Sequence, residues 1–262
     1  MFCRMKSLAR VLFALLLAPL SALADNSVVN MSHYDLVRPD FVGMKSEGVV
    51  GVIHEATYPR YERDAGYYER FRAARQAGLL WGAYHFADGT NPIRQADHFL
   101  DVVSTSVPRL LPTEADRNRP GVLLVLDFEK NTHYRGGTMS VAQAVAFVER
   151  INERTGKYPG LYCSEYRLRQ MLYAPGVTPV QRRALTNCWL WIANYHFEPR
   201  NVAPWRAWQL WQYTGDGRCD LRPRSAFPTR VANLRRAERN IFRGTNAELQ
   251  TFWKEHAWFP GG

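Results

Sequence analysis

Residues 122–129 read VLLVLDFE, and this stretch decides how the rest of the chain is interpreted. Five aliphatic residues run directly into Asp127, Phe128 and Glu129. A continuously apolar strand is typical of a parallel sheet that is covered on both faces. Because side chains alternate along a strand, Asp127 and Glu129 point to one side, with Cα atoms about 6.6 to 7 Å apart, and Phe128 points into the helix layer on the other. The stretch predicts a buried parallel strand that ends in two carboxylates.

Similar apolar segments, rich in β-branched and aromatic residues, occur on both sides of this strand. They begin at Val28, Gly48, Leu79, Gly160, Cys188 and Ala207. Helical patterns lie between the first five strands: one follows Asp64 and stops at Gly78, and another opens with the S-x-x-Q capping box of Ser140 and stops at Gly156. Repeated strand and helix units in a chain of this length predict an α/β fold of the (β/α) barrel type.

The pattern changes after Gly160, where the strands lie closer together and prolines interrupt the segments between them. A last helix begins near Asn246, behind the T-x-x-E box of Thr245 and Glu248. No internal repeat or low-complexity linker divides the chain. We therefore predict one domain whose barrel is incomplete on its C-terminal side.

The N-terminus predicts export. Arg4, Lys6 and Arg10 precede VLFALLLAPLSALA, which is too short and too interrupted by proline to span a bilayer comfortably but suits a signal peptide cleaved after Ala24. Residues 1–24 are then the signal and 25–262 the catalytic domain, and the net charge falls from +10 to +7. We expect a periplasmic or secreted protein that has no membrane contact after cleavage.

The composition excludes several classes of protein and of partner. With 46% hydrophobic and 22% charged residues, the chain is neither disordered, collagen-like nor a coiled coil. Its basic residues are interleaved with acids and carry no nucleic-acid motif, so we expect no nucleic acid as partner. The three cysteines outside the signal, Cys163, Cys188 and Cys219, lack zinc-site spacing. They allow either one Cys188–Cys219 bridge or three unpaired buried thiols.

Two carboxylates at one strand end suit acid chemistry, because burial and mutual repulsion should raise the pKa of one and leave the other ionised. The alternative is an ordinary strand end that is paired with an arginine. Other strand ends supply further polar residues: Asn30, Ser32, His33, His54, Glu55, Tyr84, His85 and Asp88. These histidines and acids leave open a metal-dependent polysaccharide deacetylase, although no pair has the i, i+2 or i, i+4 spacing of a strong metal motif.

Tryptophans concentrate near the C-terminal end of the chain. Five of the eight lie close together, at Trp189, Trp191, Trp205, Trp208 and Trp211. Flat aromatic faces stack on the C–H faces of sugar rings, so this density suits a carbohydrate groove. Alternation along strands means that at least half of these side chains belong to the core.

At this point the chain resembles a known family, the glycoside hydrolase family 25 lysozymes. The segments that carry the resemblance are, in order, VVNMSHYD, GVIHEAT, AGLLWGAYHF, QADHFL, VLDFE, GKYPGLYC, LWIANY, WQLWQYTGDG and ERNIFRGTNAELQTFW. They cover nearly the whole chain after the signal. The resemblance implies a single-domain, flattened, incomplete TIM-like (β/α)5(β)3 barrel.

The resemblance also implies an activity, which is hydrolysis of the β-1,4 bond between N-acetylmuramic acid and N-acetylglucosamine in peptidoglycan. Glu129 would be the general acid and base, and Asp127 would stabilise an intermediate formed by the substrate's own acetamido group. The residues expected to contact the glycan are Tyr84, His85, Tyr162, Trp191, Tyr195 and Gln212. The family requires no cofactor and no metal, and we expect a monomer whose partner is the glycan strand.

Three departures from the family pattern stand out. Asn30 replaces the aspartate of the usual D-x-S motif, Glu238 stands for the acid of the last strand, and Glu55 replaces a common lysine. Asn30 cannot carry the charge, and the longer arm of Glu238 could misplace its carboxylate. We include both positions among the catalytic candidates. Two functions follow: an active muramidase, or a catalytically impaired peptidoglycan-binding protein of the same fold.

Overall fold

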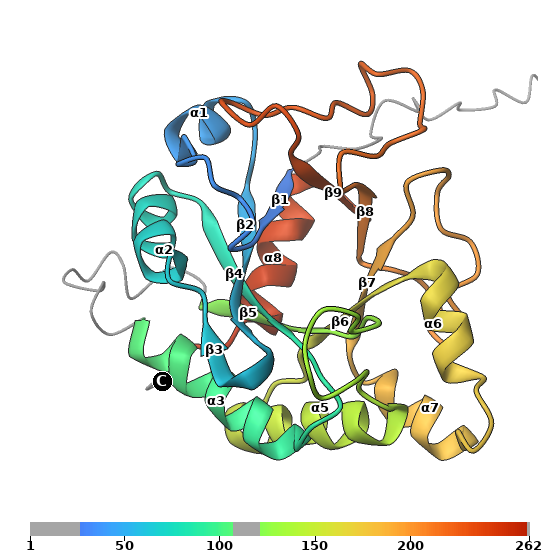
Figure 1. Ribbon diagram of the computed structural model, residues 1–262. Helices are drawn as coiled ribbons and strands as arrows, with labels where there is room; N and C mark the ends of the chain where they lie inside the picture. Colours follow the sequence, from blue (N-terminus) through green and yellow to red (C-terminus); the bar gives the residue numbers. More distant parts are fainter. Residues whose placement is uncertain (1–26, 107–120, 261–262) are drawn as a thin grey trace, which may run out of the picture.

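A computed structural model describes residues 27–106 and 121–260 of the chain (Figure 1). The strands are β1 (Val28–Met31), β2 (Gly51–Tyr58), β3 (Glu62–Arg63), β4 (Leu80–Phe86), β5 (Val122–Asp127), β6 (Gly160–Ser164), β7 (Trp189–Ala193), β8 (Leu210–Thr214) and β9 (Glu238–Phe242). The helices are α1 (Phe41–Ser46), α2 (Tyr67–Gln76), α3 (Pro92–Ser106), α5 (Val141–Thr155), α6 (Glu165–Leu172), α7 (Pro179–Leu185) and α8 (Asn246–His256), with a 3-10 turn, η2 (Pro59–Tyr61). The predicted signal peptide lies outside the described residues.

The sheet closes on itself. Its order is β1-β9-β8-β7-β6-β5-β4-β2-β3, and β1 also pairs with β2. The pairings from β1 through β2, β4, β5, β6 and β7 to β8 are parallel, whereas β9 runs antiparallel to both β8 and β1. In the described chain, helices follow β1, β2, β4, β5 and β6, and the strands β7, β8 and β9 follow without helices between them. The predicted (β/α)5(β)3 architecture is confirmed.

Strand β5 shows why the barrel forms. Leu124, Leu126 and Phe128 belong to the apolar layer between the sheet and the helices, and Leu123 and Val125 belong to a second layer inside the barrel. All five side chains are at most 2% exposed. Alternation therefore buries both faces of the strand, as its continuous apolar sequence predicts.

One end of the barrel is filled by the C-terminal helix. Trp253 of α8 belongs to the inner apolar layer, and its indole N–H donates to the carbonyl of Trp81 at 3.0 Å. Trp258 forms a bridge with Val122, the first residue of β5. These contacts lie at the N-terminal ends of the parallel strands, so the polar strand ends face the opposite, open end of the barrel.

Local sequence signals hold in the structure. The capping boxes predicted at Ser140 and Thr245 are both formed, and Gly156 ends α5 with a φ of 68°. The three cysteines are buried and free, so the Cys188–Cys219 bridge is absent and the alternative of unpaired thiols applies. In the described part of the chain, no helix combines the length and the apolar character needed to cross a bilayer.

Candidate active site

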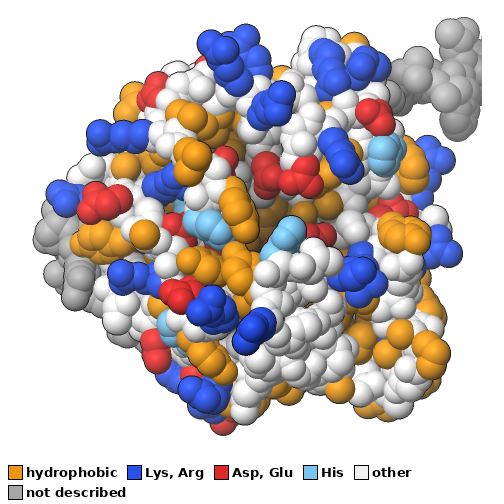
Figure 2. Space-filling view, viewed as in Figure 1, with side chains coloured by type: hydrophobic (Ala, Val, Ile, Leu, Met, Phe, Trp, Pro, Cys, Tyr) orange, Lys and Arg blue, Asp and Glu red, His pale blue; other side chains and the backbone are white. Residues whose placement is uncertain are grey.

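A pocket of about 290 Å³ opens among the C-terminal ends of the parallel strands. Figure 2 shows acidic side chains gathered at this central hollow and basic side chains spread around its rim. Eight of the ten predicted site residues line the pocket: Asn30, Tyr84, Asp127, Glu129, Tyr162, Trp191, Tyr195 and Glu238. Residues from six different strands, together with the segments that follow them, thus meet in one place, as expected for a barrel of this type.

His85 does not line the pocket, and its prediction as a glycan contact is wrong. Its ring nitrogens contact Thr57 at 2.8 Å and Gln95 at 2.9 Å, and its ring stacks on Phe147 of α5. Since Tyr84 points into the pocket, alternation along β4 turns His85 into the helix layer. There, burial lowers the pKa of His85 to about 4, so the ring is neutral at pH 7.

Gln212 supports the pocket from behind. Its side chain is buried, accepts a hydrogen bond from the hydroxyl of Tyr162, and donates one to Glu238 at 3.1 Å. Both partners line the pocket, while Gln212 itself does not. The glutamine therefore fixes two pocket side chains, and the direct glycan contact predicted for it is not seen.

Asp127, the last residue of β5, and Glu129, two residues beyond it, both line the pocket. Asp127 is buried, and its Oδ1 atom finds no hydrogen-bond partner among the described residues. Burial raises the pKa of Asp127 well above its usual range, and the nearby charges of Glu129, Glu55 and Glu238 act in the same direction. The pKa of Glu129 is also raised, chiefly by burial. The expectation that only one pKa would rise is wrong, because both groups are taken out of water.

The opposite wall holds Glu238 through a directed chain of hydrogen bonds. The indole N–H of Trp191 can only donate, and it donates to Oδ1 of Asn240 at 2.7 Å. The Nδ2 of Asn240 then donates to Oδ1 of Asn30 at 2.9 Å, and the Nδ2 of Asn30 donates to the Glu238 carboxylate. Gln212 is a second donor to the same oxygen. The indole therefore sets the orientation of the Asn240 and Asn30 amides, and Glu238 accepts at the end of the chain.

Burial and these donors act on Glu238 in opposite directions. The pKa of Glu238 is raised from 4.5 to about 7, chiefly by burial and in part by the charges of Asp35 and Asp216. The amide of Asn30 lowers the pKa, because it stabilises the ionised form. Glu238 consequently changes its protonation state near neutral pH.

Several pocket residues were not predicted from the sequence. These are Tyr34, Phe86, Lys130, His133, Tyr134 and Asp216. Asp216 adopts a left-handed backbone with φ 52° in the turn after β8, and its charge raises the pKa of both Glu129 and Glu238. The T-G-D-G segment at 214–217 marks a turn in the sequence, but nothing local indicates that it folds back over β5.

Most tryptophans of the tryptophan-rich region belong to the core. Trp191 lines the pocket, and Trp189 lies with it in the inner apolar layer. Trp205, Trp208 and Trp211 all belong to the layer outside the sheet. Of the five predicted candidates for a sugar-binding face, only Trp191 reaches the pocket.

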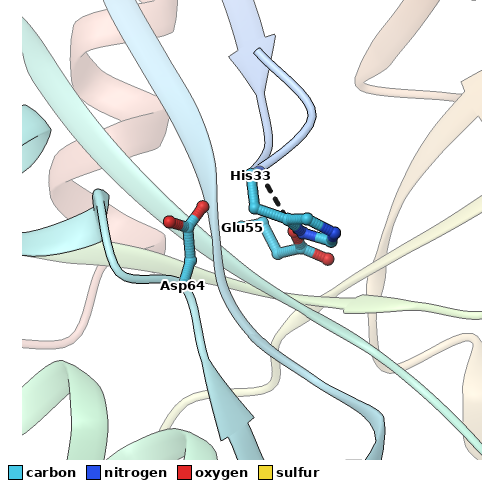
Figure 3. A group of neighbouring side chains, drawn as sticks. All are labelled: His33, Glu55 and Asp64. Carbon is cyan, nitrogen blue, oxygen red and sulfur yellow. Dashed lines mark hydrogen bonds and ion pairs between the residues drawn. The ribbon is translucent and has the colours of Figure 1, made fainter. Parts of the chain in front are cut away.

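One group of side chains in the described residues has the composition of a metal site. His33, Glu55 and Asp64 place one ligand atom each within 4.8 Å of one another (Figure 3). Nδ1 of His33 bonds directly to Glu55, whereas Asp64 lies on the other side of β2, beside His54 at 3.6 Å. The ligand set is suited to a divalent cation, and in the structure two of its three members, His33 and Glu55, are hydrogen-bonded to each other.

The histidines of the deacetylase hypothesis do not converge. The His54 ring stacks on Trp81 with centroids 5.6 Å apart, and its Nε2 accepts from Arg70 at 2.9 Å. Burial lowers the pKa of His54 to about 4. None of His33, His54 and His85 lines the pocket, so the three histidines do not meet there and the structure gives this alternative no support.

Comparison with known proteins places this geometry in a family. Residues 29–220 match Glycosyl hydrolases family 25. The chain belongs to this family. No curated protein matches the chain.

Solved structures of the family share the fold. A muramidase from Acremonium alcalophilum is 22% identical with a TM-score of 0.62, and the match covers 87% of this chain and 98% of the other. A lysozyme from Streptomyces coelicolor is 23% identical with a TM-score of 0.64, covering 87% and 97%. A family 25 lysozyme from Aspergillus fumigatus is 22% identical with a TM-score of 0.61, covering 85% and 96%.

The family match includes Asn30, Asp127 and Glu129 but ends before Glu238. The antiparallel pairing of β9 with β1 sets Glu238 directly opposite Asn30 in the sheet. The structure thus brings Asn30 and Glu238 of this family 25 chain into one hydrogen-bonded unit.

Proposed function

We propose that this family 25 chain is a muramidase that cleaves the β-1,4 bond between N-acetylmuramic acid and N-acetylglucosamine in peptidoglycan. The observation that carries the proposal is the pair Asp127 and Glu129 at the open end of the barrel, in a pocket lined by Tyr84, Tyr162 and Trp191. Two carboxylates and sugar-sized aromatic faces are the groups that glycoside hydrolysis uses.

Glu129 acts as the general acid. Its raised pKa keeps a larger share of the side chain protonated near neutrality than for an ordinary glutamate. The proton passes to the glycosidic oxygen as the bond breaks, and the resulting carboxylate then takes a proton from the attacking water. Glu129 borders both the acidic pocket and the cavity beside it, so it can reach the oxygen between two sugars.

Asp127 stabilises the intermediate. In a substrate-assisted retaining reaction, the acetamido oxygen of the sugar attacks C1 and forms a positively charged oxazolinium ring. The buried Oδ1 of Asp127 lacks a partner among the described residues, and the acetamido N–H of the substrate can supply one. This N–H and the developing cation favour ionised Asp127, which leaves the proton shared by the coupled pair on Glu129.

The test is a digest of purified peptidoglycan by residues 25–262, with Glu129→Gln alongside and the products reduced and analysed by mass spectrometry. We expect reduced muramic acid ends from the parent, and a loss of about 10²-fold to 10⁴-fold in their rate of release by Glu129→Gln. Background release by the parent, with both proteins co-sedimenting with the wall, would identify a binding protein instead.

We also propose that residues 1–24 direct export to the periplasm or the medium, with cleavage after Ala24, and that the mature chain is a monomer. The apolar run that follows three basic residues supports the first proposal. N-terminal sequencing of the exported protein tests the cleavage site. Light scattering of residues 25–262 tests the oligomeric state.

A further inference from the structure

A groove leads away from the acidic pocket along α6. A second cavity of about 460 Å³ shares Glu129, Tyr195 and Asp216 with the acidic pocket. A third cavity, of about 650 Å³, shares Tyr166 and Arg169 with the second. We call the second and third cavities together the α6 groove. Because neighbouring cavities share walls, the groove is continuous with the site of the proposed reaction.

A buried carboxylate joins the two segments that form the wall of the α6 groove. Glu165, only 7% exposed, accepts from Nδ2 of Asn194 at 2.7 Å and from the backbone N–H of Asn201 at 3.0 Å. Oδ1 of Asn194 accepts in turn from the backbone N–H groups of His196 and Phe197. The segment after β7 is thereby tied to α6, and the groove has a defined shape without a ligand.

This wall presents two kinds of side chain to solvent. Tyr166 and Phe197 are 75% and 52% exposed, although aromatic side chains are usually buried. Arg169 is exposed as well, and its guanidinium forms no ion pair or hydrogen bond within the described parts of the chain. Exposed aromatic faces suit sugar rings, and a guanidinium without a partner suits a carboxylate.

The position of Glu129 assigns the direction of the substrate. Asp127, Asn30 and Glu238 line the acidic pocket but not the α6 groove, whereas Glu129 lines both. A general acid protonates the oxygen between two sugars. The sugar that becomes cationic therefore lies beside Asp127, and the departing sugar lies on the other side of Glu129, in the groove.

We propose that the α6 groove binds the departing half of the glycan and that Arg169 binds a carboxylate of the stem peptide on that half. The departing half begins with N-acetylglucosamine, which fits the second cavity. The next sugar is a muramic acid, whose lactyl group carries the peptide with its free carboxylates, and it falls at Arg169. This inference rests on the proposed muramidase function and adds that substrate choice depends on the peptide.

The experiment compares two substrates: soluble glycan strands with their stem peptides, and the same strands after an amidase has removed the peptides. The kcat/KM for release of muramic acid ends is measured for the parent, Arg169→Gln, Arg169→Lys and Tyr166→Ala. Arg183→Gln is the matched control, because Arg183 is an exposed arginine on α7 that lines none of the cavities described above.

We expect Arg169→Gln to lower kcat/KM about three- to five-fold on peptide-bearing strands only, with partial retention in Arg169→Lys. Tyr166→Ala should lower kcat/KM for both substrates, since it removes a sugar contact. Arg183→Gln should leave kcat/KM unchanged for both. Equal kcat/KM of the parent for the two substrates would overturn the inference. An equal loss by Arg169→Gln on both substrates would do the same.

A binding measurement separates this inference from the proposed function. Absence of product from both substrates would refute the muramidase proposal alone. In that case the Kd of the Glu129→Gln variant is measured for both kinds of strand. If this variant binds peptide-bearing strands more tightly, and the double variant Glu129→Gln with Arg169→Gln does not, the proposed role of the α6 groove is supported. The same Kd for both strands contradicts it.

Discussion

The two walls of the acidic pocket hold their carboxylates in different ways. On the β5 wall, Asp127 is buried, the outward side chains Leu124, Leu126 and Phe128 belong to the outer apolar layer, and one oxygen of Asp127 lacks a partner among the described residues. On the β9 and β1 wall, Glu238 accepts hydrogen bonds from the amides of Asn30 and Gln212. One wall leaves a carboxylate available to substrate, and the other ties its carboxylate to the protein.

The difference bears on the role of Asn30. An aspartate at position 30 would place a second acceptor against Glu238, whereas Asn30 supplies a donor. Asn30 is therefore a positioning residue for Glu238.

The apolar backing of β5 should give the largest effect on stability. Phe128 is fully buried in the outer layer, so Phe128→Ala should lower the free energy of unfolding by about 3 to 5 kcal/mol. Urea denaturation measures the change. Phe197→Ala is the control, since its side chain is 52% exposed and should change stability by about 0.5 kcal/mol or less. Equal effects of the two substitutions would mean that Phe128 does not support the wall.

The next prediction exchanges acid and amide on each wall. Asp127→Asn removes the charge that faces the substrate and should lower kcat about 10²-fold to 10³-fold. The reverse exchange, Asn30→Asp, adds an acceptor beside Glu238. It should lower kcat about tenfold and change the dependence of kcat on pH. Steady-state rates on soluble glycan strands measure both. If the two exchanges lowered kcat equally, the walls would not differ in function.

Much of the β5 wall was predictable from the sequence, and little of the other wall was. The alternation in VLLVLDFE is a local property, so it placed Phe128 outside and the two acids inside. The Asn30–Glu238 contact joins positions 208 apart and depends on β9 closing the sheet against β1. The prediction for His85 was wrong because both His85 and its neighbour Tyr84 were expected to face the pocket. Adjacent side chains of a strand point to opposite sides, so His85 points outward.

Glu238 predicts how stability depends on pH. Its folded-state pKa of about 7 lies above the ordinary 4.5, so the folded state holds a proton that the unfolded state has lost between these values. The free energy of unfolding of the parent should fall as pH rises through this window. Glu238→Gln lacks this loss and should be about 1 to 3 kcal/mol more stable than the parent at pH 8, with little difference at pH 4. Urea denaturation at both pH values measures the difference, and a constant offset would contradict it.

Asp216 links the two walls and should give the smallest effect. It lines both the acidic pocket and the α6 groove. Its negative charge raises the pKa of Glu129 and is the second largest cause of that shift, after burial. Asp216→Asn removes that charge and keeps the shape, so the pKa of Glu129 should fall. Since the reaction needs protonated Glu129, the alkaline limb of kcat/KM should move to lower pH. Asp220→Asn is the matched control, because Asp220 pairs with His196 at 2.6 Å and lines neither cavity. A limb that stays in place for Asp216→Asn would mean that burial alone sets the acidity of Glu129, and the β5 wall would then act independently of the rest of the pocket.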